Sequence, residues 1–232
     1  MNEFAVQSDK TAMLIIRPKL KQTDKTIKSI NVDGNEIKEK KSFKMLGLYI
    51  DNQLTFREHS KRIKNKTRSV VSAIKRISKF ISTESATKIL RSCLINKIVY
   101  GGLFYLTKKS IRDDMQKIVM RAVRIIKKKK LKDKIRNDIL LESLGVPSLE
   151  VITKRQCLLE MAKLGAKREL IFPSMNDRTR GNAMKKVRPI SRNQRLQNSF
   201  LYQMEKLWNE FNHLLEEPIT KKGKEMIKAI IK

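Results

Sequence analysis

The sequence predicts an α+β fold in which a short β-rich segment is followed by a mainly α-helical region. Up to residue 56, apolar residues cluster in short β-branched runs bounded by turn signals, as in strands. From Arg57 onward they recur at steps of three and four residues, as in amphipathic helices. We therefore divide the chain into a β-rich segment (1–56), a helical region (57–165), a basic linker (166–195) and C-terminal helices (196–232).

Strands are predicted first at 12–17 (AMLIIR) and 27–32 (IKSINV). The dipeptide Asp33-Gly34 is a two-residue hairpin signal, so the residues after it are expected to return as a strand. A further apolar strand is predicted at 43–50 (FKMLGLYI). Within it, Gly47 indicates a bulge or a close approach of another backbone.

The first predicted helix begins at Arg57, ends near Ile81 and has one narrow apolar stripe. The stripe consists of Ile63, Thr67, Val70, Ile74, Ile77 and Ile81. A second helix is expected to bury Cys93 among its apolar residues and to end at Gly101-Gly102.

The third predicted helix starts with a capping box of Ser110 and Asp113 and ends in the cationic run 127–130, which suits the helix dipole. Asp133 is expected to cap a fourth helix, and Ser148 a fifth. An amphipathic helix is predicted around 200–215. The core is expected to include four aromatic side chains: Tyr100, Phe104, Tyr105 and Trp208.

The net charge of the chain indicates which class of molecule it binds. Lys and Arg number 53 against 23 Asp and Glu, which gives a net charge of +30. A charge of this size repels itself unless a polyanion neutralises it, which favours nucleic acid or an anionic membrane as partner. The longest nearly apolar run, 98–106, is well short of the roughly 18 to 20 residues that cross a bilayer, so no membrane-spanning segment is expected. Of the two polyanions we expect nucleic acid and no membrane as partner.

The sequence contains no pattern typical of a disulfide framework, a zinc site or a signal peptide. Cys93 and Cys157 are the two cysteines and form no disulfide framework, which favours a reducing compartment. His59 and His213 are the two histidines, and no Cys/His cluster has zinc spacing. No signal peptide pattern is visible at the start, and no metal site is predicted.

The helix from Arg57 is the strongest candidate for a functional surface. Glu58 is the only acid among its many basic residues, although like charges four residues apart destabilise a helix. A face that tolerates this cost is expected to bind phosphates; the alternative is a generic lysine-rich surface. The predicted nucleic-acid-binding residues are Arg57, Lys61, Arg62, Lys64, Lys66, Arg68, Lys75 and Arg76.

A series of short motifs indicates a family. Lys10-Thr11 precedes an apolar strand, and after a hairpin come Phe43-Lys44-Met45-Leu46-Gly47, Asp51, Leu54-Thr55-Phe56 and His59. Their order resembles the region after the active-site strand pair in non-LTR (LINE-like) retrotransposon reverse transcriptases, with Met45 in place of the usual tyrosine. Segments 94–106, 140–149 and 199–211 are similar to the helices that follow in that family.

The resemblance implies a role for each region. The β-rich segment would be the end of the palm and the helical region the thumb. Phe43, Leu46 and Gly47 would correspond to the primer grip, and Lys10 would lie near the phosphates of an incoming nucleotide.

The family's two-metal site uses palm aspartates that include an aromatic-x-Asp-Asp turn upstream of the Lys-Thr pair, and this sequence does not contain that turn. Asp113-Asp114 is the one Asp-Asp pair, and it is interpreted as part of a helix start. We therefore expect no catalytic residues and no cofactor in this chain, with Mg²⁺ only in a full-length parent enzyme. Whether the chain counts as an enzyme stays open, but alone it is expected to be inactive as an RNA-directed DNA polymerase.

The sequence thus favours a C-terminal fragment of a retrotransposon reverse transcriptase that binds RNA or RNA–DNA duplexes through their backbones. The missing palm and fingers of a parent polymerase would be a further partner. Two alternatives stay open: a stand-alone basic helical RNA- or DNA-binding protein, and a translated relic of a transposable element without activity. The expected location is intracellular, in the nucleus or in a cytoplasmic ribonucleoprotein.

Overall fold

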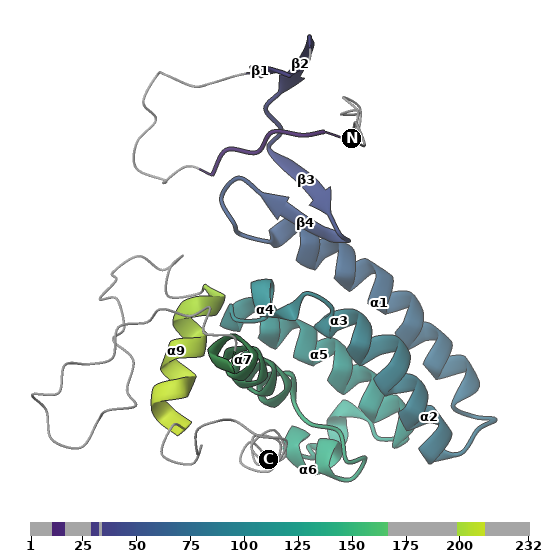
Figure 1. Cartoon of the computed structure of the whole chain (residues 1–232). Helices are drawn as coiled ribbons and strands as arrows, with labels where there is room; N and C mark the ends of the chain where they lie inside the picture. Colours follow the sequence, from purple (N-terminus) through teal and green to yellow (C-terminus); the bar gives the residue numbers. More distant parts are fainter. Residues whose placement is uncertain (1–10, 17–28, 33, 167–198, 212–232) are drawn as a thin grey trace, which may run out of the picture. The chain divides into compact units, whose positions relative to one another are not determined.

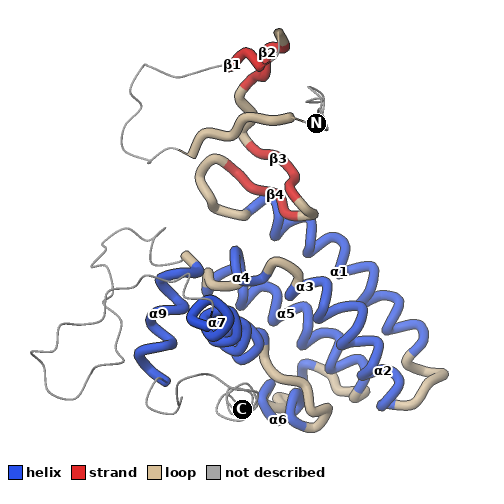
Figure 2. The backbone as a smooth tube through the Cα atoms, in the orientation of Figure 1, coloured by secondary structure: helices blue, strands red, loops and turns tan. Residues whose placement is uncertain are grey.

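The computed structural model describes residues 11–16, 29–32, 34–166 and 199–211 (Figure 1). Backbone contacts divide the chain into an N-terminal unit, residues 1–62, and a C-terminal unit, residues 63–232. In Figure 2 the described strands precede helix α1, and the elements after it are helical. The α+β class and the order of the two regions are therefore as predicted.

The first hairpin of the N-terminal unit pairs β1 (Ser29–Val32) with β2 (Asn35–Lys38) in antiparallel register. Val32 pairs with Asn35, so the connection is the two-residue loop predicted from Asp33-Gly34. The segment predicted as a strand at 12–17 is not one in its described part, residues 12–16. It makes an isolated bridge between Met13 and Glu39.

The segment 43–50 is a second hairpin and not the single strand that was predicted. Strands β3 (Ser42–Met45) and β4 (Leu48–Asp51) are antiparallel and pair Met45 with Leu48. The turn between them has positive φ at both central residues, 45° at Leu46 and 85° at Gly47. That pair of angles matches a type I′ turn, whose backbone twist suits a hairpin and whose second position glycine fills without strain.

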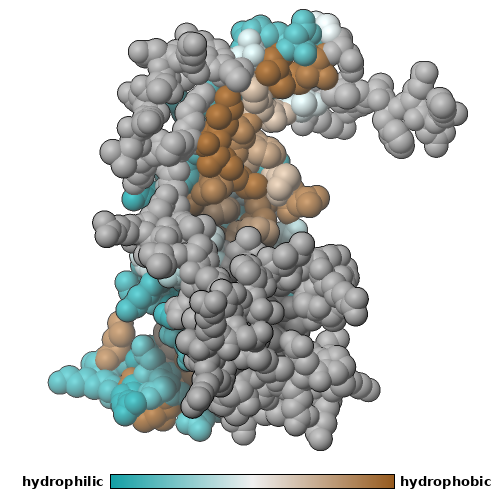
Figure 3. All heavy atoms as spheres, turned by 60° about the vertical axis from the view of Figure 1, so that its left-hand side comes forward, coloured by the Kyte–Doolittle hydropathy of each residue, from teal (hydrophilic) through white to brown (hydrophobic). Residues whose placement is uncertain are grey.

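The N-terminal unit leaves apolar side chains in solvent. The surface view shows hydrophobic residues gathered over the strand-bearing part of the chain (Figure 3). In this unit Ile16, Ile30, Met45 and Leu46 are more than 40% exposed, and Leu46 reaches 83%. Small two-stranded sheets cannot bury both of their faces, so some apolar side chains of this unit stay exposed.

Helix α1 (Arg57–Ile77) buries one side of its surface, as the predicted stripe requires. Thr67 and Ile74 are buried as predicted, and Val71 is more deeply buried than Val70. The helix is shorter than predicted because Ser82 starts the next one by accepting a hydrogen bond from the amide of Ser85 at 3.1 Å.

A π-helical turn, Leu90–Ile95, joins α2 (Thr83–Ile89) to α3 (Asn96–Val99). Its backbone hydrogen bonds span five residues, so the buried positions advance by four: Leu90, Leu94 and Ile98. Cys93, predicted on the buried face, is exposed as a result.

The glycine pair ends this helical run as predicted, because Gly101 adopts a left-handed conformation (φ 65°) and α4 (Gly102–Tyr105) follows. Of the aromatic residues predicted in the core here, only Tyr105 is buried. Tyr100 and Phe104 are 59% and 54% exposed, so that part of the prediction was wrong. Gly101 separates α3 from α4, and the two exposed rings lie on either side of it in the sequence.

Helix α5 (Lys109–Ile126) lies at the centre of the C-terminal unit and buries Met115, Val119 and Ala122 as predicted. It starts earlier than predicted: its N-cap is Lys108, so Ser110 lies inside the first turn and does not cap it. The run 127–130 follows its last residue, as expected.

The remaining described helices are α6 (Asn137–Glu142), α7 (Leu149–Ala166) and α9 (Phe200–Phe211). Asp133 accepts a hydrogen bond from the amide of Lys130 in a short 3₁₀ turn and does not cap α6. Ser148 caps α7 as predicted, with its hydroxyl accepting from the amide of Val151 at 3.3 Å.

Helix α9 packs against α7 (Figure 1) and buries Met204 and Leu207. Ala166, the first residue of the predicted linker 166–195, is the last residue of α7. The rest of that linker, residues 212–232 and Lys10 lie outside the described residues, as does the side chain of Trp208. No helix in the described ranges is both long and apolar enough to span a bilayer.

Candidate nucleic-acid interface

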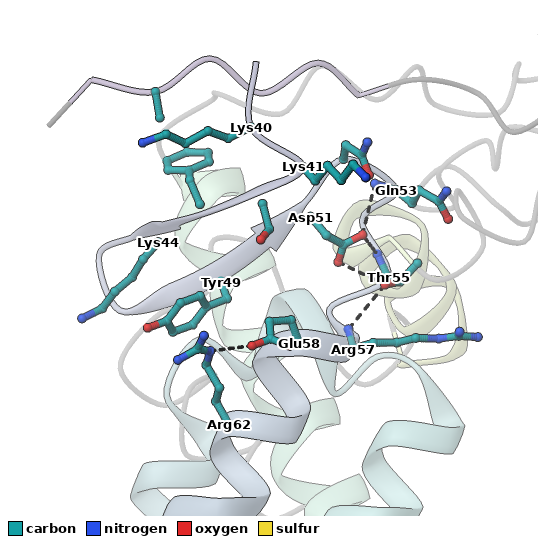
Figure 4. A pocket seen from close by; sticks show the side chains of 14 residues that line it. Lys40, Lys41, Lys44, Tyr49, Asp51, Gln53, Thr55, Arg57, Glu58 and Arg62 are labelled. Atoms are coloured by element: carbon teal, nitrogen blue, oxygen red, sulfur yellow. Dashed lines mark hydrogen bonds and ion pairs between the residues drawn. The ribbon is translucent and has the colours of Figure 1, made fainter. Parts of the chain in front are cut away.

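Asp51 organises the junction between the second hairpin and helix α1. Its carboxylate accepts hydrogen bonds from the amides of Gln53, Thr55 and Phe56 at 3.1, 2.9 and 2.6 Å. It also accepts one from the Thr55 hydroxyl at 3.1 Å (Figure 4). Leu54 and Phe56 adopt positive φ in this tight loop, so the carboxylate fixes the point at which α1 begins.

The Asp51 carboxylate is held ionised. Burial raises its pKa, but the hydrogen bonds from the amides of Thr55 and Phe56 and from the Thr55 hydroxyl outweigh burial, and the pKa lies below its ordinary value. The residues of the Asp51, Leu54-Thr55-Phe56 and His59 motif therefore have a structural task here: they join a hairpin to a helix.

His59 and Arg62 extend this junction to strand β4. The amide of Tyr49 donates to Nδ1 of the buried His59 at 3.4 Å. The Arg62 guanidinium lies over the Tyr49 ring, 4.2 Å from its centroid, and donates to Glu58 at 2.7 Å. Arg62 is thus held flat on the hairpin, with part of its charge neutralised.

A pocket of about 750 Å³ opens beside this junction within the N-terminal unit (Figure 4). Its acids, Asp51 and Glu58, already accept hydrogen bonds from the protein. Its aromatic side chains are Phe43 and Tyr49. The cationic lining consists of Lys40, Lys41, Lys44, Arg57 and Arg62. Such a lining can hold phosphate oxygens next to an aromatic ring.

The predicted primer-grip-like residues separate in the structure. Phe43 lines the pocket with Tyr49. Leu46 and Gly47 form the tip of the β3–β4 hairpin and are not part of the pocket lining. The pocket lysines at 40, 41 and 44 were not predicted as site residues, although their closeness in sequence to Phe43 was a usable signal.

The predicted cations of α1 fall into three groups. Arg57 and Arg62 line the pocket of the N-terminal unit. A second hollow, in the C-terminal unit between α1 and α5, is lined by Lys64, Arg68 and Lys75. Lys61, Lys66 and Arg76 are exposed and line neither hollow. Helical geometry places Arg76 opposite the buried Thr67 and Ile74, with Lys61 to one side of it and Lys66 to the other. We call these three residues the outer face of α1.

Most of these charges lack an acidic partner. Within the described ranges, Arg62 pairs with Glu58 and Lys64 with Asp114. The hydrogen bond from Lys64 holds the pKa of the Asp114 carboxyl below its ordinary value, although Asp114 was predicted only as part of a helix start. For the other six predicted cations, no described carboxylate lies within ion-pair distance. Their charge is available to an external anion.

The described residues contain no group of three or more His, Cys, Asp or Glu side chains that could hold a metal ion. The chain matches no protein-family model, no curated protein and no solved structure. The similarity to LINE-like reverse transcriptases therefore depends on the motifs of the sequence.

Proposed function

We propose that the chain binds the sugar–phosphate backbone of RNA or RNA–DNA duplexes and forms the palm-end, thumb and C-terminal part of a LINE-like reverse transcriptase. The observation that carries this proposal is the surplus of cations on α1 for which no carboxylate partner is described. Like charges along one helix cost folding free energy, and a row of phosphates would offset that cost.

The geometry of α1 suits a backbone more than a base sequence. Lys61, Lys66 and Arg76 span 15 residues of a regular helix, about 22 Å, so several phosphates can be met at once. Lysine and arginine side chains on such a face position a duplex without reading its bases. We therefore expect similar affinity for duplexes of different sequence.

The exposed apolar surface of the N-terminal unit supports the second part of the proposal. Ile16, Ile30, Met45 and Leu46 would be covered if the rest of a palm packed against these hairpins. A stand-alone basic nucleic-acid-binding protein is the second candidate, and the same α1 charges favour it. The two differ in whether palm and fingers supplied in trans bind the chain.

Binding to a labelled RNA–DNA hybrid tests the shared part of the proposal. We expect binding that weakens steeply with salt and varies less than about threefold among hybrids of unrelated sequence. No binding at 50 mM salt would overturn the proposal, and so would strong preference for one sequence. A primer-extension assay with Mg²⁺ or Mn²⁺ is expected to show no synthesis by the chain alone.

A further inference from the structure

The hollow between α1 and α5 differs in chemistry from the outer face of α1. It is a groove of about 1240 Å³ that lies within the C-terminal unit. Its α1 wall carries the three cations Lys64, Arg68 and Lys75, and its α5 wall carries Lys117, Arg121 and Arg124. Each set lies along one side of its helix because its successive members are separated by three, four or seven residues. Two cationic rows thus border one groove.

The balance of charge in the groove is strongly positive. Lys129 brings the lining to seven cations, and the acids are Asp113 and Asp114. Both acids lie near the start of α5, where Asp114 pairs with Lys64 and Lys117. The rest of the groove has no acid in its lining, so an occupant would meet unneutralised cations on both sides.

The floor of the groove is aliphatic. Val71 and Met120 are buried at its base, and Ile118 and Ile125 are half-buried. Leu131 stands at the end away from Asp114 and is 83% exposed. The lining contains no aromatic side chain, whereas sites for single-stranded nucleic acid combine cations with aromatic rings on which bases stack.

An apolar floor between two cationic rims complements an amphipathic helix with an apolar stripe and acidic flanks. The length also fits, because Lys64 and Lys75 are about 16 Å apart along α1, equal to three turns of an occupant helix. We infer that this groove is a docking site for an acidic amphipathic helix of a partner protein.

The charge of this chain argues for a different protein as the partner. The segments 167–198 and 212–232 both carry more Lys and Arg than Asp and Glu, and a second copy would bring a net charge of +30. The cationic rims of the groove would repel either of these segments and a second copy of the chain. Arg68 and Lys75 are shared with the cation surplus behind the proposed function, but Lys61, Lys66 and Arg76 lie outside the groove lining, so peptide binding and duplex binding can be tested by different variants.

The test uses the full chain and a labelled synthetic peptide of about 15 residues. Leucines occupy its positions i, i+4, i+7 and i+11, with glutamates beside them, and a scrambled peptide of equal composition is the control. We expect the patterned peptide to bind at least about tenfold more tightly than the scrambled one, because only the former presents an apolar stripe.

Three variants locate the site. The double change Arg68→Glu and Arg121→Glu reverses one charge on each wall and should weaken peptide binding by about tenfold or more. The double change Lys66→Glu and Arg76→Glu is the matched control outside the groove and should weaken it by less than about threefold. Leu131→Ser leaves the charge unchanged and should weaken it by roughly fivefold. Circular dichroism and thermal unfolding verify that each variant is folded.

Several results would overturn the inference. Equal binding of both peptides, or no effect of Leu131→Ser, would mean diffuse electrostatic attraction. Equal losses of peptide binding in the two double variants would also mean diffuse electrostatic attraction. If the peptide fails to bind while the Arg68/Arg121 variant loses binding to a single-stranded oligonucleotide, the groove accepts nucleic acid. Binding of the RNA–DNA hybrid, measured beside these assays, reports on the proposed function separately.

Discussion

The carboxylate of Asp51 accepts a hydrogen bond from the amide of Phe56 across 2.6 Å and so joins the last residue of β4 to the residue before α1. The same carboxylate also accepts from Gln53 and Thr55. Backbone amides in a tight loop have few other partners, so one side chain satisfies three of them. The position of the first turn of α1, and of Arg57 and Arg62 on it, depends on this residue.

Asp51→Asn is expected to lower the free energy of unfolding by about 1 to 2 kcal/mol. The amide side chain can still accept through one oxygen, but its nitrogen cannot accept the bonds made by the second carboxylate oxygen. Urea denaturation measures the change. Asp138→Asn is the matched control: its exposed carboxylate pairs with Arg136 and accepts from a single amide, that of Ile139, so the midpoint should move by less than half as much. Equal losses in both variants would contradict the role of Asp51.

The contribution of Asp51 should also depend on pH. Because its pKa is lowered in the folded state, the unfolded chain takes up the proton first as pH falls. The stabilisation is therefore fully present above the unfolded pKa, about 3.9, and is lost as pH falls through the lower folded pKa. We expect the stability difference between wild type and Asp51→Asn to be constant from about pH 5 to 7 and to shrink below about pH 4. A difference that grows in acid would mean a raised pKa.

Tyr105 anchors the turn after α3 through its hydroxyl, which donates to the carbonyl of Ile98. Burial raises the pKa of Tyr105, so the hydroxyl keeps its proton and stays a donor at physiological pH. Tyr105→Phe should lower the unfolding free energy by about 1 to 1.5 kcal/mol because a buried carbonyl loses its partner. Tyr100→Phe, at an exposed ring in the same turn, should lower it by less than half as much, because its hydroxyl is not buried. Similar effects of the two changes would rule out the buried hydrogen bond.

The sequence predicted the elements whose signals are local. The period of three to four residues located α1 and α5, and Asp33-Gly34 located the first hairpin. Ser148 was identified as a cap because its hydroxyl needs only a neighbouring amide. Each of these signals depends on residues a few positions apart, which is why no knowledge of the tertiary structure was needed.

The sequence predictions failed where packing between distant residues, or an unusual backbone conformation, determines the local structure. Leu46 is an uncommon residue for a left-handed turn position, so the second hairpin was predicted as one strand. The π-helical turn shifts the buried positions and exposes Cys93, and no sequence period indicates such a turn. The groove cations on α5 share the spacing of those on α1. Their role needed the packing of two helices that are about 50 residues apart in the chain.

The salt dependence of duplex binding is the most direct measure of the outer face of α1. Each phosphate that a cation neutralises contributes about −0.9 to the slope of log K against log salt. Lys61, Lys66 and Arg76 have no described carboxylate partner, so changing all three to glutamine should flatten the slope by about two to three units. Affinity should fall equally for all sequences, because phosphate contacts carry no base information.

The matched control changes Lys127, Lys128 and Lys129 to glutamine. It removes the same charge from the segment that follows α5, at a distance along the chain from α1. If the duplex lies along the outer face, the control should flatten the slope by less than about one unit. Equal flattening by the control and the α1 variant would mean that the net charge of +30 attracts the duplex without a defined site. Fluorescence anisotropy at four or more salt concentrations separates the two outcomes, because a slope counts released counterions while a single affinity does not.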